Sequence, residues 1–277
     1  MKNTSMMTQK IKHFIFGYGS LICPKSRSIT APSLHEAIAE PVLVVGIERI
    51  WAAKVIFSRG QKNRDHIQGC TPMGIRKRQG AICNGVLIHV DDEELARFDI
   101  REEGYKRHKI DLVDVYPHCE SADCRDDPEL LKEVACPECR IVFERAHRKR
   151  TTSDDAKSDD MGLPKISVWV YIQNDDSSPN PSFPITQSYV DIIMRGCLSI
   201  SKEFTSRFLQ TTHGWWQDGL DSVSDDSRSQ HHTWVDDRQS PMYVRADSDY
   251  SIEHGDMIDQ LLEEHHPHAL KKRVVSM

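Results

Sequence analysis

The sequence lacks several features that mark well-known classes of protein. Among its 277 residues, no run approaches the roughly 18 apolar residues of a membrane span, and the N-terminal stretch MKNTSMMTQKIKHF has no apolar signal core. A strong excess of charge of one sign is also missing, because the net charge is only -6 and acidic and basic residues are mixed along the chain. These absences argue against a membrane or nucleic-acid partner. We therefore expect a cytoplasmic protein with a small-molecule partner.

A disulfide framework and internal repeats are absent as well. The eight cysteines are scattered through a chain too long to need disulfides for stability, so we expect reduced thiols. Hydrophobic residues make up 38% of the chain, which is enough for the core of one large domain. The sequence predicts a domain over 11–216 and a C-terminal extension over 217–277.

Runs of β-branched and aromatic residues predict six strands, at 13–16, 42–50, 54–58, 81–90, 105–115 and 166–172. A short helix is expected after Asp91 or Asp92, and two further helices are expected within 185–212, with Pro184 in the first turn. The pattern predicts an α+β fold with a mixed, partly closed sheet of six strands and helices packed around it.

A segment of different composition, 118–163, interrupts the predicted strands. It includes RAHRKR followed by TTSDDAKSDD, and such blocks of charge without apolar periodicity are typical of a solvated, disordered insertion. The tail after Trp216 is also mostly polar. Within that tail, HTWVDDRQSPMYVRA and DMIDQLLEEHH are expected to pack locally.

Two pairs of cysteines in this insertion resemble a four-thiolate zinc site: Cys119, Cys124, Cys136 and Cys139. Pro137 within CPEC suits the tight turn of a zinc ligand pair. The looser spacing of the first pair and the presence of Arg140 where a glycine often follows favour free thiols instead. Both interpretations stay open at this point.

The stretch HFIFGYGSLI, 13–22, runs from a predicted strand directly into Gly17-Tyr18-Gly19-Ser20. A dinucleotide-binding fingerprint is excluded because Ile22 occupies the third glycine position and Pro24 follows before any amphipathic helix. The glycines then serve either a structural turn, where they supply positive φ, or a close approach of backbone N–H groups to a ligand.

A second candidate element is FDIREEGYKR, 98–107, at the end of the predicted short helix. Acids and bases at a helix end are usually only solvated. Here, however, Glu102 is flanked by Phe98 and Tyr105, which could partly desolvate a carboxylate and make it a general base. A shift of one residue would give that role to Glu103.

Together these two stretches resemble the γ-glutamylcyclotransferase superfamily, including its glutathione-specific ChaC-type branch and its plant and fungal relatives. The resemblance is carried by FGYGSL at 16–21 and by Asp99-Ile-Arg-Glu102 followed by Tyr105. It continues over 80–107 and over PSFPITQSYVDIIMRGCL with FLQTTHGWW. The insertion and the tail after 216 lie outside it, and the acid and the tyrosine are slightly closer together than in ChaC-type relatives.

The resemblance implies a barrel-like sheet with a pocket at its mouth and an enzyme that cyclises a γ-glutamyl group to 5-oxoproline, without metal or organic cofactor. Glu102 would act as general acid and base. The residues implied in substrate binding are Gly17, Tyr18, Gly19, Ser20, Leu21 and Tyr105. A related γ-glutamyl-amine or amino-acyl lyase, or a non-catalytic binding protein of the same fold, are the alternatives. The preferred γ-glutamyl compound and the oligomeric state are left open.

Overall fold

The computed structural model describes residues 11–35, 37, 39–56, 67–118, 165–174, 179–180, 182–215 and 234–275. The four cysteines of the predicted zinc site, and all but the first residue of the predicted insertion, lie outside these ranges. Among the helices that the structure describes, none is long and apolar enough to cross a membrane.

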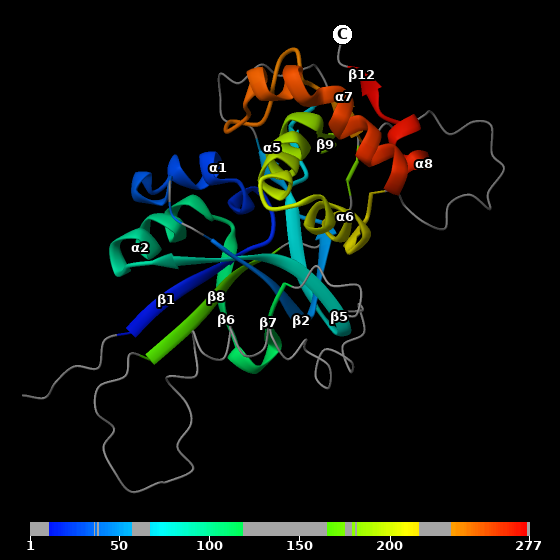
Figure 1. Cartoon of the computed structure of the whole chain (residues 1–277). Coiled ribbons are helices and arrows are strands. Elements are labelled where there is room, and N and C mark those ends of the chain that lie inside the picture. The colour runs from blue at the N-terminus through cyan, green and yellow to red at the C-terminus, as the bar shows by residue number, and fades with distance from the viewer. Residues whose placement is uncertain are drawn as a thin grey trace, which may run out of the picture.

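A mixed, curled sheet forms the centre of the fold (Figure 1). Its strands follow the order β10-β2-β5-β1-β8-β6, and β7 also pairs with β2. Their bounds are β1 Ile11–Gly17, β2 Glu40–Trp51, β5 Met73–Val90, β6 Tyr105–Ile110, β7 Val115–Pro117, β8 Lys165–Gln173 and β10 Thr212–His213. The pairs β1–β8 and β2–β10 are parallel and the other pairs are antiparallel. The prediction of a mixed sheet with packed helices is confirmed.

Two predicted strands differ from those in the structure. The run at 105–115 is divided, because β6 is an edge strand that pairs only with β8 and ends at Ile110. After a 3-10 turn at Leu112–Asp114, the chain forms β7 against β2 instead. The described part of the run at 54–58 supplies β3, Val55–Ile56, which pairs with β4, Gly69–Cys70, in a separate small sheet.

The short predicted helix is α2, Asp92–Arg101. It begins with a capping box: the Asp91 carboxylate accepts the N–H of Glu94 at 2.8 Å, and the Glu94 carboxylate accepts the N–H of Asp91 at 3.0 Å. Each of these hydrogen bonds pairs a backbone N–H group that the start of a helix otherwise leaves without an acceptor. The other α-helices are α1 Pro24–Ser28, α5 Gln187–Leu198, α6 Lys202–Gln210, α7 Ser248–His265 and α8 Pro267–Lys271.

The placement of Pro184 in the first turn of a helix is wrong. Ile185–Thr186 form strand β9, and α5 begins only after Thr186. The reason is a long-range pairing: β9 lies parallel to β11, Trp234–Asp236, which also pairs with β12, Val274–Val275.

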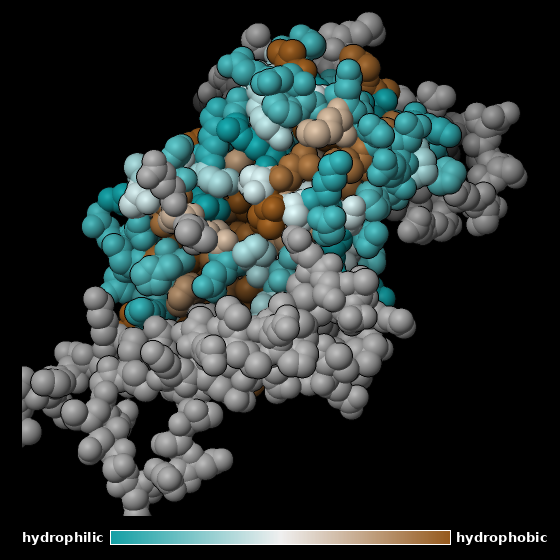
Figure 2. All heavy atoms as spheres, viewed as in Figure 1, coloured by the Kyte–Doolittle hydropathy of each residue, from teal (hydrophilic) through white to brown (hydrophobic). Residues whose placement is uncertain are grey.

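The C-terminal residues 234–275 cover the helical side of the fold. In Figure 1, α7 and α8 lie over α5 and α6, and the fully buried side chains of Ile258 and Leu262 on α7 join the main core. Figure 2 shows hydrophilic residues over much of α7 and α2, with hydrophobic residues in the recess around α5 and α6. The two tail stretches expected to pack locally form β11 and α7.

Candidate active site

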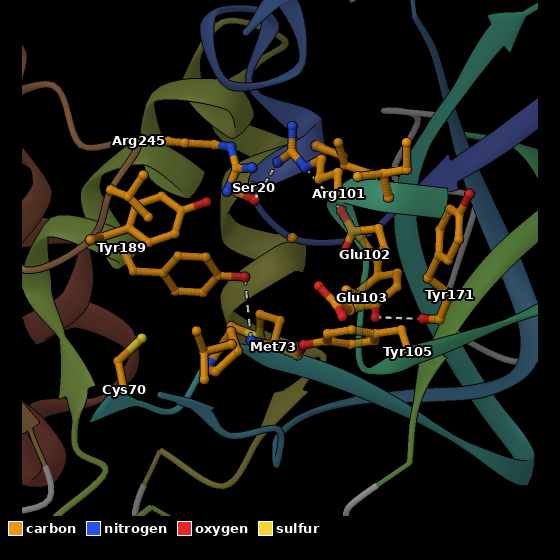
Figure 3. A pocket seen from close by; sticks show the side chains of 18 of the residues that line it. Ser20, Cys70, Met73, Arg101, Glu102, Glu103, Tyr105, Tyr171, Tyr189 and Arg245 are labelled. Carbon is orange, nitrogen blue, oxygen red and sulfur yellow. Dashed lines mark hydrogen bonds and ion pairs between the residues drawn. The ribbon is translucent and has the colours of Figure 1, made fainter. Parts of the chain in front are cut away.

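A pocket of about 510 Å³ opens between the loop that follows β1 and the junction of α2 with β6 (Figure 3). The remaining walls come from the β3–β4 hairpin, the start of β5, helix α5 and the turn before α7. Its lining includes most of the residues that the sequence predicts for substrate binding and catalysis: Tyr18, Gly19, Ser20, Leu21, Glu102, Glu103 and Tyr105. Gly17 does not line the pocket, because it ends β1 in register with Val86.

The loop after β1 lines the pocket and contains backbone N–H groups without a partner in the described part of the chain. A 3-10 turn, Ser20–Ile22, begins directly after Gly19, and the Ile22 N–H donates to the Gly19 carbonyl at 2.9 Å. The N–H groups of Ser20 and Leu21 stand at the start of this turn, where helical geometry offers no acceptor. Neither of them has a hydrogen-bond partner among the residues described. They are therefore free to bind an oxygen of a ligand.

Glycine at position 19 is required by close packing. Its φ is -138°, so the expectation that the loop glycines supply positive φ is wrong, and Gly17 has no positive φ either. A Cβ at position 19 would lie 3.1 Å from Tyr189 Oη and 3.3 Å from Met73 Cβ, which is tighter than ordinary contact. A side chain there would require Tyr189 and Met73 to shift by a few tenths of an ångström.

Glu102 lies at the end of α2, and its side chain reaches into the pocket while only 18% exposed. Its carboxylate forms an ion pair of 2.9 Å with Arg101 Nε. Burial raises the pKa of Glu102, and the charges of Arg101 and Arg245 oppose part of that rise. A carboxylate with a raised pKa is a stronger base than an exposed one, so Glu102 suits proton transfer.

Arg101 holds Glu102 in position. Its side chain is only 3% exposed, and its Nη1 donates to the Ser26 carbonyl and to Thr30 Oγ1 at 2.8 and 3.0 Å. Its Nη2 donates to Ser20 Oγ at 3.1 Å and to Ser26 Oγ at 3.0 Å. Arg101 thus joins Glu102 to the loop after β1 through fixed bonds. Nothing in the sequence distinguishes Arg101, because an arginine in the last turn of a helix is usually solvated.

Three tyrosines line the pocket, of which Tyr18 and Tyr189 are buried and Tyr105 is partly buried. Tyr105 Oη donates to the Met73 carbonyl at 3.0 Å, and Tyr18 Oη donates to the Tyr171 carbonyl at 2.6 Å. Tyr189 Oη instead accepts the Met73 N–H at 3.3 Å, so its own proton is available to a ligand. Burial raises the pKa of Tyr18, Tyr105 and Tyr189, which keeps all three hydroxyls neutral and able to donate.

Cys70 also lines the pocket, but its thiol is a poor nucleophile. Burial raises its pKa to about 12, so the thiolate that nucleophilic attack requires is scarce at neutral pH. The rim of the pocket is apolar and carries four exposed aliphatic side chains: Val55, Ile56, Ile100 and Val244. In the described part of the chain, no group of three or more His, Cys, Asp or Glu side chains is placed to hold a metal ion.

One wall of the pocket is not predicted from the sequence. Met242, Tyr243, Val244 and Arg245, in the turn before α7, line the pocket opposite Glu102. Figure 3 shows Arg245 and Glu102 entering from opposite sides. Nothing in the sequence around 242–245 indicates this placement, because it depends on how α7 docks on α5.

A search of protein-family profiles finds no match to the chain, and a search of curated proteins finds none. Solved structures do show similarity. They include a gamma-glutamyl cyclotransferase (14% identity, 71% of this chain and 86% of that chain, TM-score 0.40). An uncharacterized protein from Homo sapiens is 15% identical over 72% of this chain and 87% of its own, with a TM-score of 0.40.

A third similar structure is a gamma-glutamyl cyclotransferase specific to glutathione from yeast. It is 15% identical over 67% of this chain and 79% of its own, with a TM-score of 0.34. At this level of identity, the chemistry of the pocket has to be argued from its own residues.

Proposed function

We propose that the protein is an enzyme that cyclises the γ-glutamyl group of a small molecule to 5-oxoproline and releases the attached amine. The observation that carries this proposal is the carboxylate of Glu102. It is largely buried, it reaches into the pocket, and the pocket is also lined by a loop with unpaired backbone N–H groups. The resemblance of both elements to the γ-glutamylcyclotransferase motifs supports the same reaction.

In this reaction Glu102 binds the α-ammonium group of the substrate and accepts one of its protons. The freed amine attacks the γ-carbonyl carbon of the same molecule, a C–N bond closes the five-membered ring, and the bond to the leaving amine breaks. Glu102 gives this proton to the leaving nitrogen, then takes the second proton from the ring nitrogen and passes it to the departing amine, which leaves as an ammonium ion. The α-nitrogen thus loses two protons and the leaving nitrogen gains two, and no oxidant, reductant or water molecule enters the balance. Because nucleophile and carbonyl belong to one molecule, the pocket mainly has to hold a folded conformer.

The loop after β1 stabilises the charge that develops during the attack. As the ring closes, the γ-carbonyl oxygen becomes negative, and the unpaired N–H groups of Ser20 and Leu21 are placed to donate to it. The neutral hydroxyl of Tyr189 is a third available donor. Leu21 and Tyr189 are buried, which makes the interactions of their donors stronger than they would be in water.

The proposal is tested by incubating the purified protein with a panel of γ-glutamyl compounds and measuring 5-oxoproline and free amine. We expect the two products in equal amounts, and we expect α-glutamyl dipeptides to be inert because their γ-carboxylate is not an activated carbonyl. The exposed aliphatic rim predicts faster turnover when the leaving amine carries an apolar side chain. Absence of 5-oxoproline with every compound would contradict the proposal.

The pH dependence of catalysis follows from the surroundings of Glu102. Since burial raises the pKa of Glu102 above its ordinary value of 4.5, protonation of the base should lower kcat/KM at a higher pH than for an exposed carboxylate. The positive charge of Arg101 lowers this pKa, so Arg101→Gln should move the acid limb of the profile to higher pH. Initial rates measured between about pH 4 and pH 9 check both statements.

The matched control is Arg97→Gln, on the exposed part of the same helix, where Arg97 pairs with Glu93 in solvent. This variant should leave the acid limb in place. If Arg101→Gln lowers the rate equally at every pH, Arg101 supports the fold around the pocket without acting on the proton affinity of Glu102.

A further inference from the structure

The turn between β11 and α7 is held rigidly beside the pocket. At its start, the buried carboxylate of Asp237 accepts the N–H and the hydroxyl of Ser188 on α5, at 2.7 and 2.6 Å, and the N–H of Met242 at 2.7 Å. At its end, Asp247 pairs with Lys25 on α1 at 2.5 Å and with Arg195 on α5. The segment between these anchors, which contains Arg245, therefore has a defined place relative to the pocket.

Arg245 differs from the other arginines of the C-terminal segment. Arg238 and Arg273 both form bidentate pairs with Asp259. The Nε of Arg245 is buried, and no acceptor among the described residues reaches it. No described carboxylate forms an ion pair with Arg245 either, although its charge acts on Glu102. A buried donor that lacks a partner has lost its hydration without replacement, so a ligand that accepts from it is favoured.

The charges around the pocket limit the ligand that Arg245 can bind. A guanidinium group matches the planar, two-oxygen geometry of a carboxylate. Glu102 stands on the opposite wall, however, and would repel a ligand that carried negative charge alone. A ligand with an ammonium group toward Glu102 and a carboxylate toward Arg245 satisfies both walls. An α-amino acid head group has these two charges on one carbon atom.

We propose that Arg245 binds the α-carboxylate of the γ-glutamyl group and thereby selects substrates in which this carboxylate is free. The inference rests on the proposed cyclisation for the identity of the ligand. In this arrangement the substrate oxygens bind to different walls of the pocket. Arg245 binds the α-carboxylate, and the N–H groups of Ser20 and Leu21 bind the γ-carbonyl oxygen. A residue of the C-terminal segment then completes a site whose base comes from α2.

The test compares two ligands that share an α-ammonium group and differ at one other group: 2-aminopentanoic acid, which carries the α-carboxylate, and its carboxamide, which does not. Isothermal titration of the full-length protein should show a preference for the acid. In Arg245→Gln, affinity for the acid should fall about tenfold or more, while affinity for the carboxamide should be nearly unchanged. Arg245→Lys, which keeps the charge but not the fork, should retain part of the preference.

The control variant is again Arg97→Gln, which removes one exposed positive charge from a residue outside the pocket lining. It should bind both ligands as the wild-type protein does, and circular dichroism should show all variants folded. If the wild-type protein binds acid and carboxamide equally, or if Arg245→Gln keeps the preference, the assignment of Arg245 is wrong. Because titration needs no turnover, these results are independent of whether 5-oxoproline is formed from any γ-glutamyl compound.

Discussion

Glu102→Gln should reduce kcat for 5-oxoproline release by about 10²–10⁴-fold, the range typical for loss of a general acid–base group. Glutamine has nearly the same size as glutamate and can still accept the hydrogen bond of Arg101 Nε, which is 2.9 Å from the carboxylate in the wild-type protein. It cannot take up a proton at neutral pH. Substrate affinity should therefore change far less than kcat, and the separation is measured from complete saturation curves.

Glu103→Gln provides the matched control for this result. Glu103 also lines the pocket, but it is exposed and makes no ion pair with a described residue, so its loss should be nearly silent. The opposite outcome, with activity kept in Glu102→Gln and lost in Glu103→Gln, would move the base by one residue. Full activity in both variants would remove the α2–β6 junction from the mechanism.

Arg238→Met should lower the free energy of unfolding by about 3–5 kcal/mol, the usual cost of breaking a buried ion pair from one side. Arg238 lies between two helices: its Nε and Nη2 bind Asp191 of α5 at 2.9 and 3.0 Å, and its Nη1 and Nη2 bind Asp259 of α7 at 3.1 and 2.8 Å. The Asp191 side chain is only 1% exposed, so the substitution leaves a buried carboxylate with Gln187 as its remaining partner.

Denaturant unfolding of the wild-type and variant proteins measures this difference. Arg97→Gln breaks an exposed pair between residues four apart on α2 and should cost less than about 0.5 kcal/mol. The same measurement shows whether the C-terminal segment is part of the cooperative fold. A loss below about 1 kcal/mol in Arg238→Met would contradict the role given to this cluster in docking α7 on α5.

Local signals in the sequence were sufficient for the elements nearest the candidate base. Asp91 and Glu94 form the capping box that starts α2, and their effect depends only on residues three apart. The order of Phe98, Gly104 and Tyr105 in the sequence likewise indicates a helix end followed by a strand. Gly104 has the positive φ of +97° that such a turn needs. The position of Glu102 at this junction follows from these neighbours.

Contacts between distant parts of the chain could not be predicted in the same way. In the sequence, Arg49 is a single charged residue within a predicted strand. In the structure its side chain is fully buried, and its Nη2 donates to the Asn84 side chain, the Phe208 carbonyl and Thr211. In the sequence, Arg245 is a charged residue in a polar tail, but in the structure it lines the pocket. Both placements are decided by how helices and strands pack, which no short-range pattern encodes.

The boundary placed at 216 between domain and extension remains a prediction, although residues beyond it contribute to the core. Trp234 of β11 packs with Trp215, with ring centroids 5.3 Å apart. The predicted zinc site also remains a prediction, since its cysteines lie outside the described ranges. The boundary at 216 and the cysteine pairs both lie in mostly polar segments of the sequence.

Intramolecular attack by the substrate amine is tested most directly by measuring whether oxygen from the solvent enters the product. A γ-glutamyl compound is converted by the wild-type protein in water labelled with heavy oxygen, and the acidic product is analysed by mass spectrometry. Because the attacking atom is the nitrogen of the substrate, we expect 5-oxoproline without label from the solvent and one free amine for each ring formed. Labelled glutamate as the first product would mean that water attacks the γ-carbonyl carbon, and intramolecular attack by the amine would be wrong.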